Sequence, residues 1–263
     1  MKKILKISAW VLLVAAIVFA LFYTGVLNRN KLCQAVEITI DYNNSEPFFS
    51  KEDIQNYIYK DDTIVGKKLS EINLGMIENL ILSNPYVYNA DVYKTMDGII
   101  KINVIQRKPI IRIYNTKNQQ YYIDDKGVKM PISDRYPTRI LIANGAIDSI
   151  YTPFRPSSNM QRADTINLQA DTLLYSLYKI AVFINKDEFL KALIEQIYVT
   201  RDMEFELVPK IGDHIIILGD ASNLKEKFTK LFYVYKEGLS QNGWNKYKTI
   251  NLKYKNQVVC TKN

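Results

Sequence analysis

The sequence is poor in the side chains that most enzymes use for chemistry. Its 263 residues include one histidine, His214, and two cysteines, Cys33 and Cys260. A zinc site would need to combine these with carboxylates from distant segments, and no G-x-S-x-G, Walker or H-E-x-x-H motif occurs. We therefore expect no catalytic centre, no metal and no cofactor, and we interpret His214 as a strand residue that faces solvent or is half packed.

The sequence also has few chain breakers. Ten glycines and eight prolines are spread over the whole length, with no repeat or low-complexity tract, and 48% of the residues are apolar. Such a chain can build real hydrophobic cores. The cysteines lie near opposite ends of the chain and could pair in an oxidising compartment, but neither has a neighbour that indicates metal ligation.

Acidic residues are fewer than basic ones: the sequence has 27 acidic and 35 basic residues, and its formal net charge is +8. The excess is distributed along strands and helix faces and is not gathered in one patch. Proteins that bind nucleic acid concentrate their basic residues on one face. We therefore expect no nucleic-acid partner.

The N-terminus carries the one long apolar run. Three lysines within residues 1–6 precede the uncharged segment 7–27, whose length as a helix matches a bilayer core of about 30 Å. The segment exceeds the apolar core of a cleaved signal peptide, the alternative interpretation, and no A-x-A site follows it. We predict a cytoplasmic tail at 1–6, a transmembrane helix at 7–27 and all later residues outside the cytoplasm.

Residues 28–108 predict a compact first domain of the order strand, helix, helix, strand, strand. Ser50 and Asp53 have the spacing of a capping box that begins a helix. A second helix covers roughly 73–82, and a hairpin follows with its turn at 96–98. Such a unit covers one face of its sheet with helices and leaves an edge of the sheet open.

Residues 109–263 predict a second domain, a mixed β domain with flanking helices, so that the whole chain is of the α+β class. Apolar residues recur at helical spacing in 173–184 and in 189–197, and strands are expected in 203–209 and 214–220. A third helix should begin near Ser222 and end with Gly238 as its C′ residue.

Adjacent acids, Asp124 and Asp125, precede Lys126 and Gly127 between two predicted strands. Such acids can hold a metal or divide acid and base roles, but Lys126 stands where a calcium loop needs an oxygen ligand. Asp and Gly are also what a tight turn requires. We predict a turn, in which replacement of both acids by Asn costs little stability; the acidic segment at Asp61 fails the calcium pattern as well.

Several motifs, weak singly but ordered along the chain, resemble the FtsQ/DivIB cell-division family. They are "NPYVYNADVYKTMDGIIKINVIQRKP", with its exit at Gln106, Arg107 and Pro109, then "YYIDDKGVKMPIS", "HIIILGD" and "INLKYKNQVV". The first domain resembles a POTRA domain. The sequence departs from the family pattern at Asn251, where Asp is usual, and at Lys253, where Arg is usual.

The resemblance implies a non-enzymatic, single-pass inner-membrane scaffold of the division septum, with its C-terminal domains in the periplasm. Its implied partners are FtsB and FtsL, and FtsB would add a strand to the edge of the last strand. Alternation in 249–255 predicts an inward face and a wet face there, and lysines on an edge discourage random pairing. The expected binding residues are Ile250, Leu252, Lys253, Tyr254, Val258 and Val259.

Two other classes of protein fit parts of the sequence. One is a POTRA-bearing subunit for envelope secretion or outer-membrane assembly, although such subunits usually carry several POTRA units or a transmembrane barrel. The other is a membrane-tethered cell-wall hydrolase. Retaining glycosidases need only two carboxylates placed by the fold, but no pair in this sequence indicates one.

Overall fold

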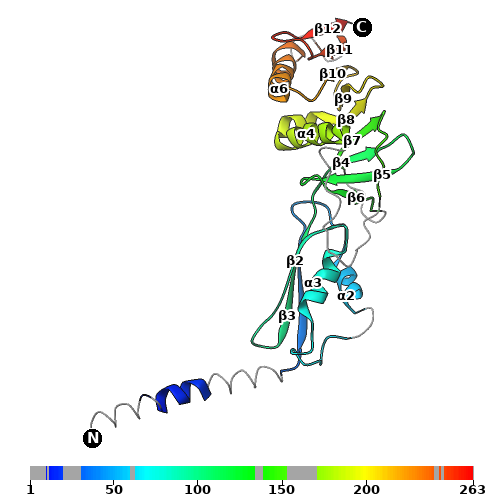
Figure 1. Cartoon of the computed structure of the whole chain (residues 1–263). Helices are drawn as coiled ribbons and strands as arrows, with labels where there is room; N and C mark the ends of the chain where they lie inside the picture. The colour runs from blue at the N-terminus through cyan, green and yellow to red at the C-terminus, as the bar shows by residue number, and fades with distance from the viewer. Residues whose placement is uncertain are drawn as a thin grey trace. The chain divides into compact units, whose positions relative to one another are not determined.

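The computed structural model describes residues 10, 12–19, 31–59, 63–133, 139–152, 171–239, 243 and 246–262. They fall into two compact units, Met1–Tyr42 with Phe49–Gln106 and Asn43–Phe48 with Arg107–Asn263 (Figure 1). Most of the predicted membrane segment 7–27, and Asp61, lie outside the described residues. Among those described, no helix combines the length and the apolarity that crossing a membrane requires.

The first unit has the predicted order of elements. Its three-stranded sheet has the order β1-β3-β2, in which β3 pairs parallel with β1 and antiparallel with β2. The helices α2 and α3 lie between β1 and β2 in the chain. The bounds are β1 (Ala35–Asp41), α2 (Lys51–Ile58), α3 (Leu74–Leu82), β2 (Val87–Lys94) and β3 (Ile99–Gln106).

Local chemistry sets the ends of these elements. The Asp53 amide donates to Ser50 Oγ over 3.2 Å and the Ser50 amide donates to Asp53 Oδ2 over 2.9 Å, which confirms the capping box. Asn73 caps α3 through a single bond, in which its Oδ1 accepts from the Met76 amide over 3.0 Å. Gly98 closes the β2–β3 hairpin with φ +89°, a conformation that side chains disfavour.

The second unit is a mixed sheet of nine strands with helices packed against it. The strand order is β12-β11-β10-β9-β8-β7-β4-β5-β6, so β6 and β12 form its two edges. Figure 1 shows these strands from green to red along the chain. The strands are β4 (Pro109–Tyr114), β5 (Gln120–Asp124), β6 (Lys129–Pro131), β7 (Leu141–Gly145), β8 (Ile194–Val199), β9 (Phe205–Pro209), β10 (Ile215–Gly219), β11 (Tyr247–Asn251) and β12 (Val259–Lys262).

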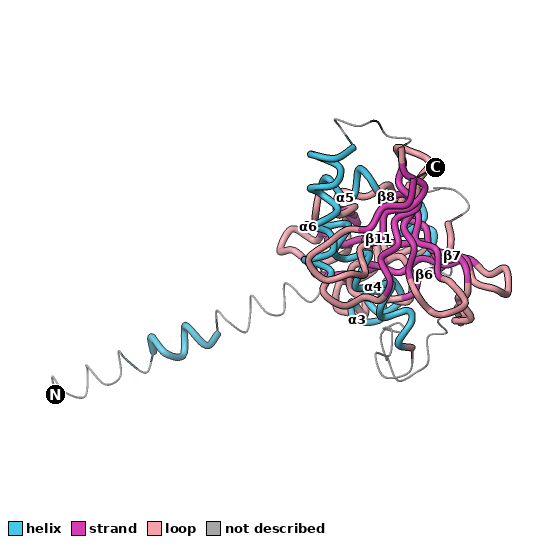
Figure 2. Tube along the Cα trace, turned by 90° about the horizontal axis from the view of Figure 1, so that it is seen from above, coloured by secondary structure: helices cyan, strands magenta, loops and turns pink. Residues whose placement is uncertain are grey.

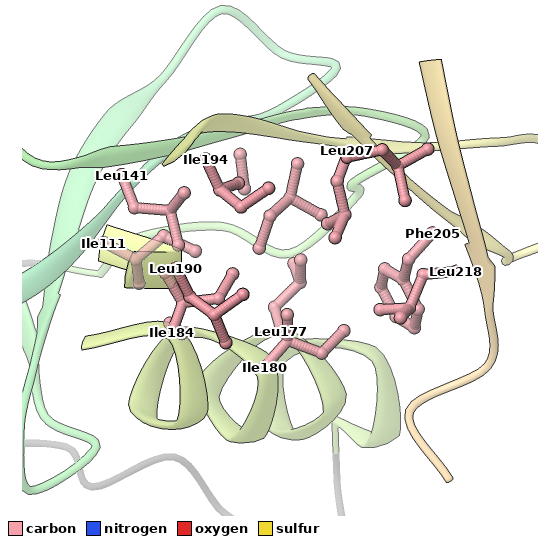
Figure 3. Packing of buried hydrophobic residues seen from close by; sticks show 14 of the residues in the cluster. Ile111, Leu141, Leu177, Ile180, Ile184, Leu190, Ile194, Phe205, Leu207 and Leu218 are labelled. Carbon is pink, nitrogen blue, oxygen red and sulfur yellow. The ribbon is translucent and has the colours of Figure 1, made fainter. Parts of the chain in front are cut away.

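The core of this unit lies between the sheet and the helices α4 (Thr172–Lys186), α5 (Glu188–Leu193) and α6 (Leu224–Tyr233). Leu177, Ile180 and Ile184 recur every three or four residues along α4 and are all buried. Figure 3 shows them pointing toward strand side chains that include Ile111, Ile194 and Leu207. Figure 2 shows α5 and α6 to one side of the magenta strands β8 and β11. This continuous core fixes the positions of the strands up to the β12 edge.

The helix predicted over 189–197 is wrong in its second half. The chain leaves α5 at Leu193 and continues as β8, which pairs parallel with β7 and antiparallel with β9. Ile194, Ile197 and Val199 are buried there. A spacing of three fits a helix face, and it also fits β8 because the register of β8 against β9 shifts between Ile194 and Gln196. The pairing with two neighbouring strands decided the outcome.

The expected role of Gly238 is also wrong. It lies inside the π-helical segment η1 (Val234–Leu239), which continues α6, and it does not adopt a left-handed conformation. Tyr235 and Leu239 are buried in the core on either side of it. Their packing keeps the chain coiled past the glycine.

Candidate partner-binding edge

β12 is the last strand of the sheet. It pairs antiparallel with β11, with Asn251 opposite Val259 and Ile250 opposite Cys260, while β11 pairs parallel with β10. In the part of the chain that the structure describes, β12 therefore has a strand on one side only. Its other side presents the backbone groups that another chain could pair with.

The prediction of one closing strand through residues 249–255 needs correction. Ile250 and Leu252 point inward and are fully buried, as predicted. The strand ends at Asn251, however, and the Leu252 amide donates to Ile217 O of β10 over 2.9 Å. Residues 252–258 then turn the chain back into β12. Lys253 and Tyr254 consequently lie in a turn, Val258 just before β12 and Val259 within it.

Lys253 is held within the protein at both its ends. Its amide donates to Asn251 Oδ1 over 3.0 Å, so this amide is not directed at a partner strand. Its Nζ lies 2.5 Å from Glu204 Oε1, and that hydrogen bond raises the pKa of Lys253. Asn251 thus starts the turn through its side-chain oxygen.

A second lysine, from α6, holds the same turn. Lys230 Nζ donates to Tyr254 O over 2.6 Å and to Leu252 O over 3.2 Å. The Tyr254 residue itself is 49% exposed. The turn therefore has a fixed backbone beneath an accessible aromatic ring.

The strand β12 is accessible along its length. Val259 is 43% exposed, Thr261 and Lys262 are exposed, and Cys260 is half-buried. Both cysteines are free thiols, Cys33 in the first unit and Cys260 in the second. Burial raises the pKa of each thiol, which makes them poor nucleophiles.

The adjacent acids lie at the other edge of the sheet, in the turn between β5 and β6. Asp124 Oδ1 accepts from the amides of Lys126 and Val128, over 2.9 and 2.7 Å, and Gly127 has φ +79°, which confirms the turn. Asp124 is nevertheless fully buried, and its Oδ2 lies 2.8 Å from Arg107 Nη1. Burial raises the pKa of Asp124, while these amides and Arg107 oppose the rise.

The expectation that both acids can be replaced cheaply by Asn is therefore revised: for Asp124, which is buried and paired with Arg107, we expect a loss of stability. It stands only for Asp125, whose carboxylate is partly exposed beside Lys126. Their different environments come from the end of β5: Asp124 is its last residue and is buried with the three residues before it, whereas Asp125 lies in the turn that follows. The charge partner, Arg107, lies 17 positions earlier in the chain, and no local pattern indicates it.

The interpretation of His214 as solvent-facing or half packed is wrong. The residue is 1% exposed, and its Nε2 lies 2.5 Å from the hydroxyl oxygen of Tyr235 in η1. Burial raises the pKa of that tyrosine. The signal was the alternation of His214 with buried Ile216 and Leu218, which puts all three on one face. Among the described residues no cluster of His, Cys, Asp or Glu could hold a metal ion.

Taken with this geometry, comparison with known proteins defines the class and then the family. Residues 31–105 match the model of a POTRA-like domain, so the chain is of the class in which a POTRA-like unit precedes a mixed α+β domain. Residues 108–261 match the model described as FtsQ/DivIB, C-terminal related. The chain therefore belongs to the FtsQ/DivIB family. No curated protein matches it.

Family membership gives the chain a role in cell division. Its two recognised domains are scaffold-type domains without catalytic function. The part of the second domain that a scaffold would use must present accessible groups on a rigid base. β12 and the turn before it have both properties.

Proposed function

We propose that this protein is a single-pass scaffold of the division machinery that binds FtsB and FtsL and recruits them to the septum. The observation that supports this most directly is the position of β12, which has a neighbouring strand on one side only among the described residues. An incoming strand would pair with its outer backbone groups.

The candidate residues divide into two roles under this proposal. Tyr254, Val258 and Val259 contact the partner, because they lie in or beside the accessible edge. Ile250 and Leu252 support that edge from the core, where both are fully buried. Lys253 covers the turn while paired with Glu204. Lysine-bearing edges are guarded against indiscriminate pairing, which favours a chosen partner.

We further propose that segment 7–27 is a retained inner-membrane anchor, with residues 1–6 in the cytoplasm and both domains in the periplasm. The uncharged run behind three lysines supports this arrangement. Sequencing the N-terminus of the mature protein tests it, and a chain beginning near Arg29 would refute it. A fluorescent fusion should collect at midcell; an even distribution over the envelope would favour the secretion or assembly subunit.

Strand addition is tested best by removing backbone donors from β12 one at a time. Successive amides of a strand point to opposite sides, so of Cys260 and Thr261 one donates toward β11 and the other outward. Proline at the outward position removes an N–H donor of β12 that only an incoming partner strand would use. One of Cys260→Pro and Thr261→Pro should therefore lose capture of the extracytoplasmic part of FtsB with an unchanged melting temperature. Full capture by both folded variants would refute strand addition here.

A further inference from the structure

We infer that Lys230 is a positioning residue for the edge strand: from α6 it holds the turn that sets where β12 begins. Only the expected effect on binding of a partner strand rests on the proposed function. The role of Lys230 in the free protein is inferred from the contacts of its ammonium group.

The Lys230 ammonium is fully engaged. It donates to the carbonyl oxygens of Tyr254 and Leu252, at 2.6 and 3.2 Å, and lies 3.4 Å from Glu226 Oε1 one turn earlier on α6. An ammonium has three donors, and these three oxygens account for them. The side chain is only 16% exposed, so water competes weakly for those bonds.

A second lysine on the same face of α6 holds the neighbouring loop. Lys227, three positions before Lys230, has a side chain only 8% exposed and donates to the backbone oxygen of Asp220 over 2.8 Å and to its Oδ1 over 2.6 Å. Asp220 directly follows β10, as Leu252 directly follows β11. The two lysines thus fasten the exits of two adjacent parallel strands to one helix.

The position of β12 depends on the contacts of Lys230 with the turn that follows β11. The strand β12 has four residues, it pairs with β11 alone among the described residues, and the turn 252–258 is its connection to the core. Without the ammonium, the part-buried carbonyl of Leu252 and the exposed carbonyl of Tyr254 lose a charged donor. The buried side chains Ile250 and Leu252 still hold β11. We therefore expect the turn and β12 to open locally while the rest of the sheet stays closed.

The first test measures amide hydrogen exchange in the purified full-length protein, without any partner. Lys230→Met keeps the aliphatic stem and removes the ammonium. It should speed exchange of the β12 amides about tenfold, a local opening easier by about 1.4 kcal/mol, and leave β8 to β10 unchanged. Lys225→Met, at an exposed lysine of the same helix, is the control and should change neither. Lys230→Arg should restore most of the protection.

The second test measures capture of the extracytoplasmic part of FtsB by the same variants. Capture should fall at least tenfold for Lys230→Met, and not for Lys225→Met, at equal melting temperature. Unchanged exchange in β12, or a uniform loss of protection across the sheet, overturns the positioning role. Failure of the unmodified protein to capture FtsB refutes the proposed function instead, and the exchange result still decides the role of Lys230.

Discussion

The two edge hairpins of the nine-stranded sheet are built alike but held differently. Each has a turn begun by an acidic or amide side chain, Asp124 before β6 and Asn251 before β12. The first is held from inside, since Asp124 is fully buried and paired with Arg107. The second is held from α6 by Lys230, and it exposes Tyr254.

This difference indicates two kinds of use. A buried charge pair makes its turn intolerant of change, because either charge alone is costly inside a protein. The edge β6 has three residues and ends in Pro131, which cannot donate to a further strand. A turn fastened at the surface leaves an accessible ring and a free strand edge. We therefore expect substitution of the buried Asp124 to affect stability at the first hairpin, and substitution of the exposed residues of the second hairpin to affect recognition.

The largest effect is expected for Asp124→Asn. It preserves a side-chain oxygen for the turn but leaves Arg107 buried without its carboxylate, which should lower the free energy of unfolding by about 3–5 kcal/mol. Asp125→Asn is the matched control, because its carboxylate is partly exposed, and should cost within about 0.5 kcal/mol. Chemical denaturation measures both; equal effects would erase the distinction between the two hairpins.

Leu252→Ala should come next, with a loss of about 2–5 kcal/mol, as for buried leucines generally. Leu252 is the point where the surface-held hairpin enters the core, since it is fully buried. Val259→Ala, on the exposed strand β12, should cost less than about 1 kcal/mol because Val259 is 43% exposed and buries less apolar area than Leu252. Denaturation curves of the two variants compare the inner and outer parts of one hairpin.

A smaller effect on stability is expected at acidic pH, from the ion pair between Lys227 and Asp220. The hydrogen bond from Lys227 lowers the pKa of Asp220 from 3.8 to about 2. Because the folded pKa lies below the unfolded one, this pair stabilises the fold above about pH 4 and loses that contribution as the pH falls toward 2. The carboxylate is 71% exposed, so the contribution is modest. Melting temperatures from pH 5 to 2 should fall less steeply for Asp220→Asn; identical slopes would contradict the shift.

Tyr254→Ala should have the smallest effect on stability, because the ring is half exposed and its backbone oxygen, not its side chain, accepts from Lys230. Aromatic residues with an apolar body and a wet hydroxyl are frequent interface hot spots. We expect loss of FtsB capture with an unchanged melting temperature. Full capture by the folded variant would place the partner elsewhere, and the contrast between the two hairpins would lose its functional meaning.

What the sequence determined by itself was local. The Ser50–Asp53 capping box, the glycine of the β2–β3 hairpin and the turn at Asp124 and Gly127 all follow from contacts within about four residues. Alternation and helical spacing also placed Ile250, Leu252 and the inner face of α4 in the core. These features do not depend on which strands become neighbours.

Tertiary structure decided what depends on distant partners. Arg107 neutralises Asp124, Tyr235 meets His214, and two strands convert the end of a helical pattern into β8. β11 ends at Asn251, and Lys230 of α6 holds the carbonyls of Leu252 and Tyr254 in the turn that follows. Hydrogen bonds and ion pairs between segments far apart in the sequence depend on the core that brings those segments together. A local sequence pattern therefore could not predict that β12 begins after a turn and forms the edge of the sheet.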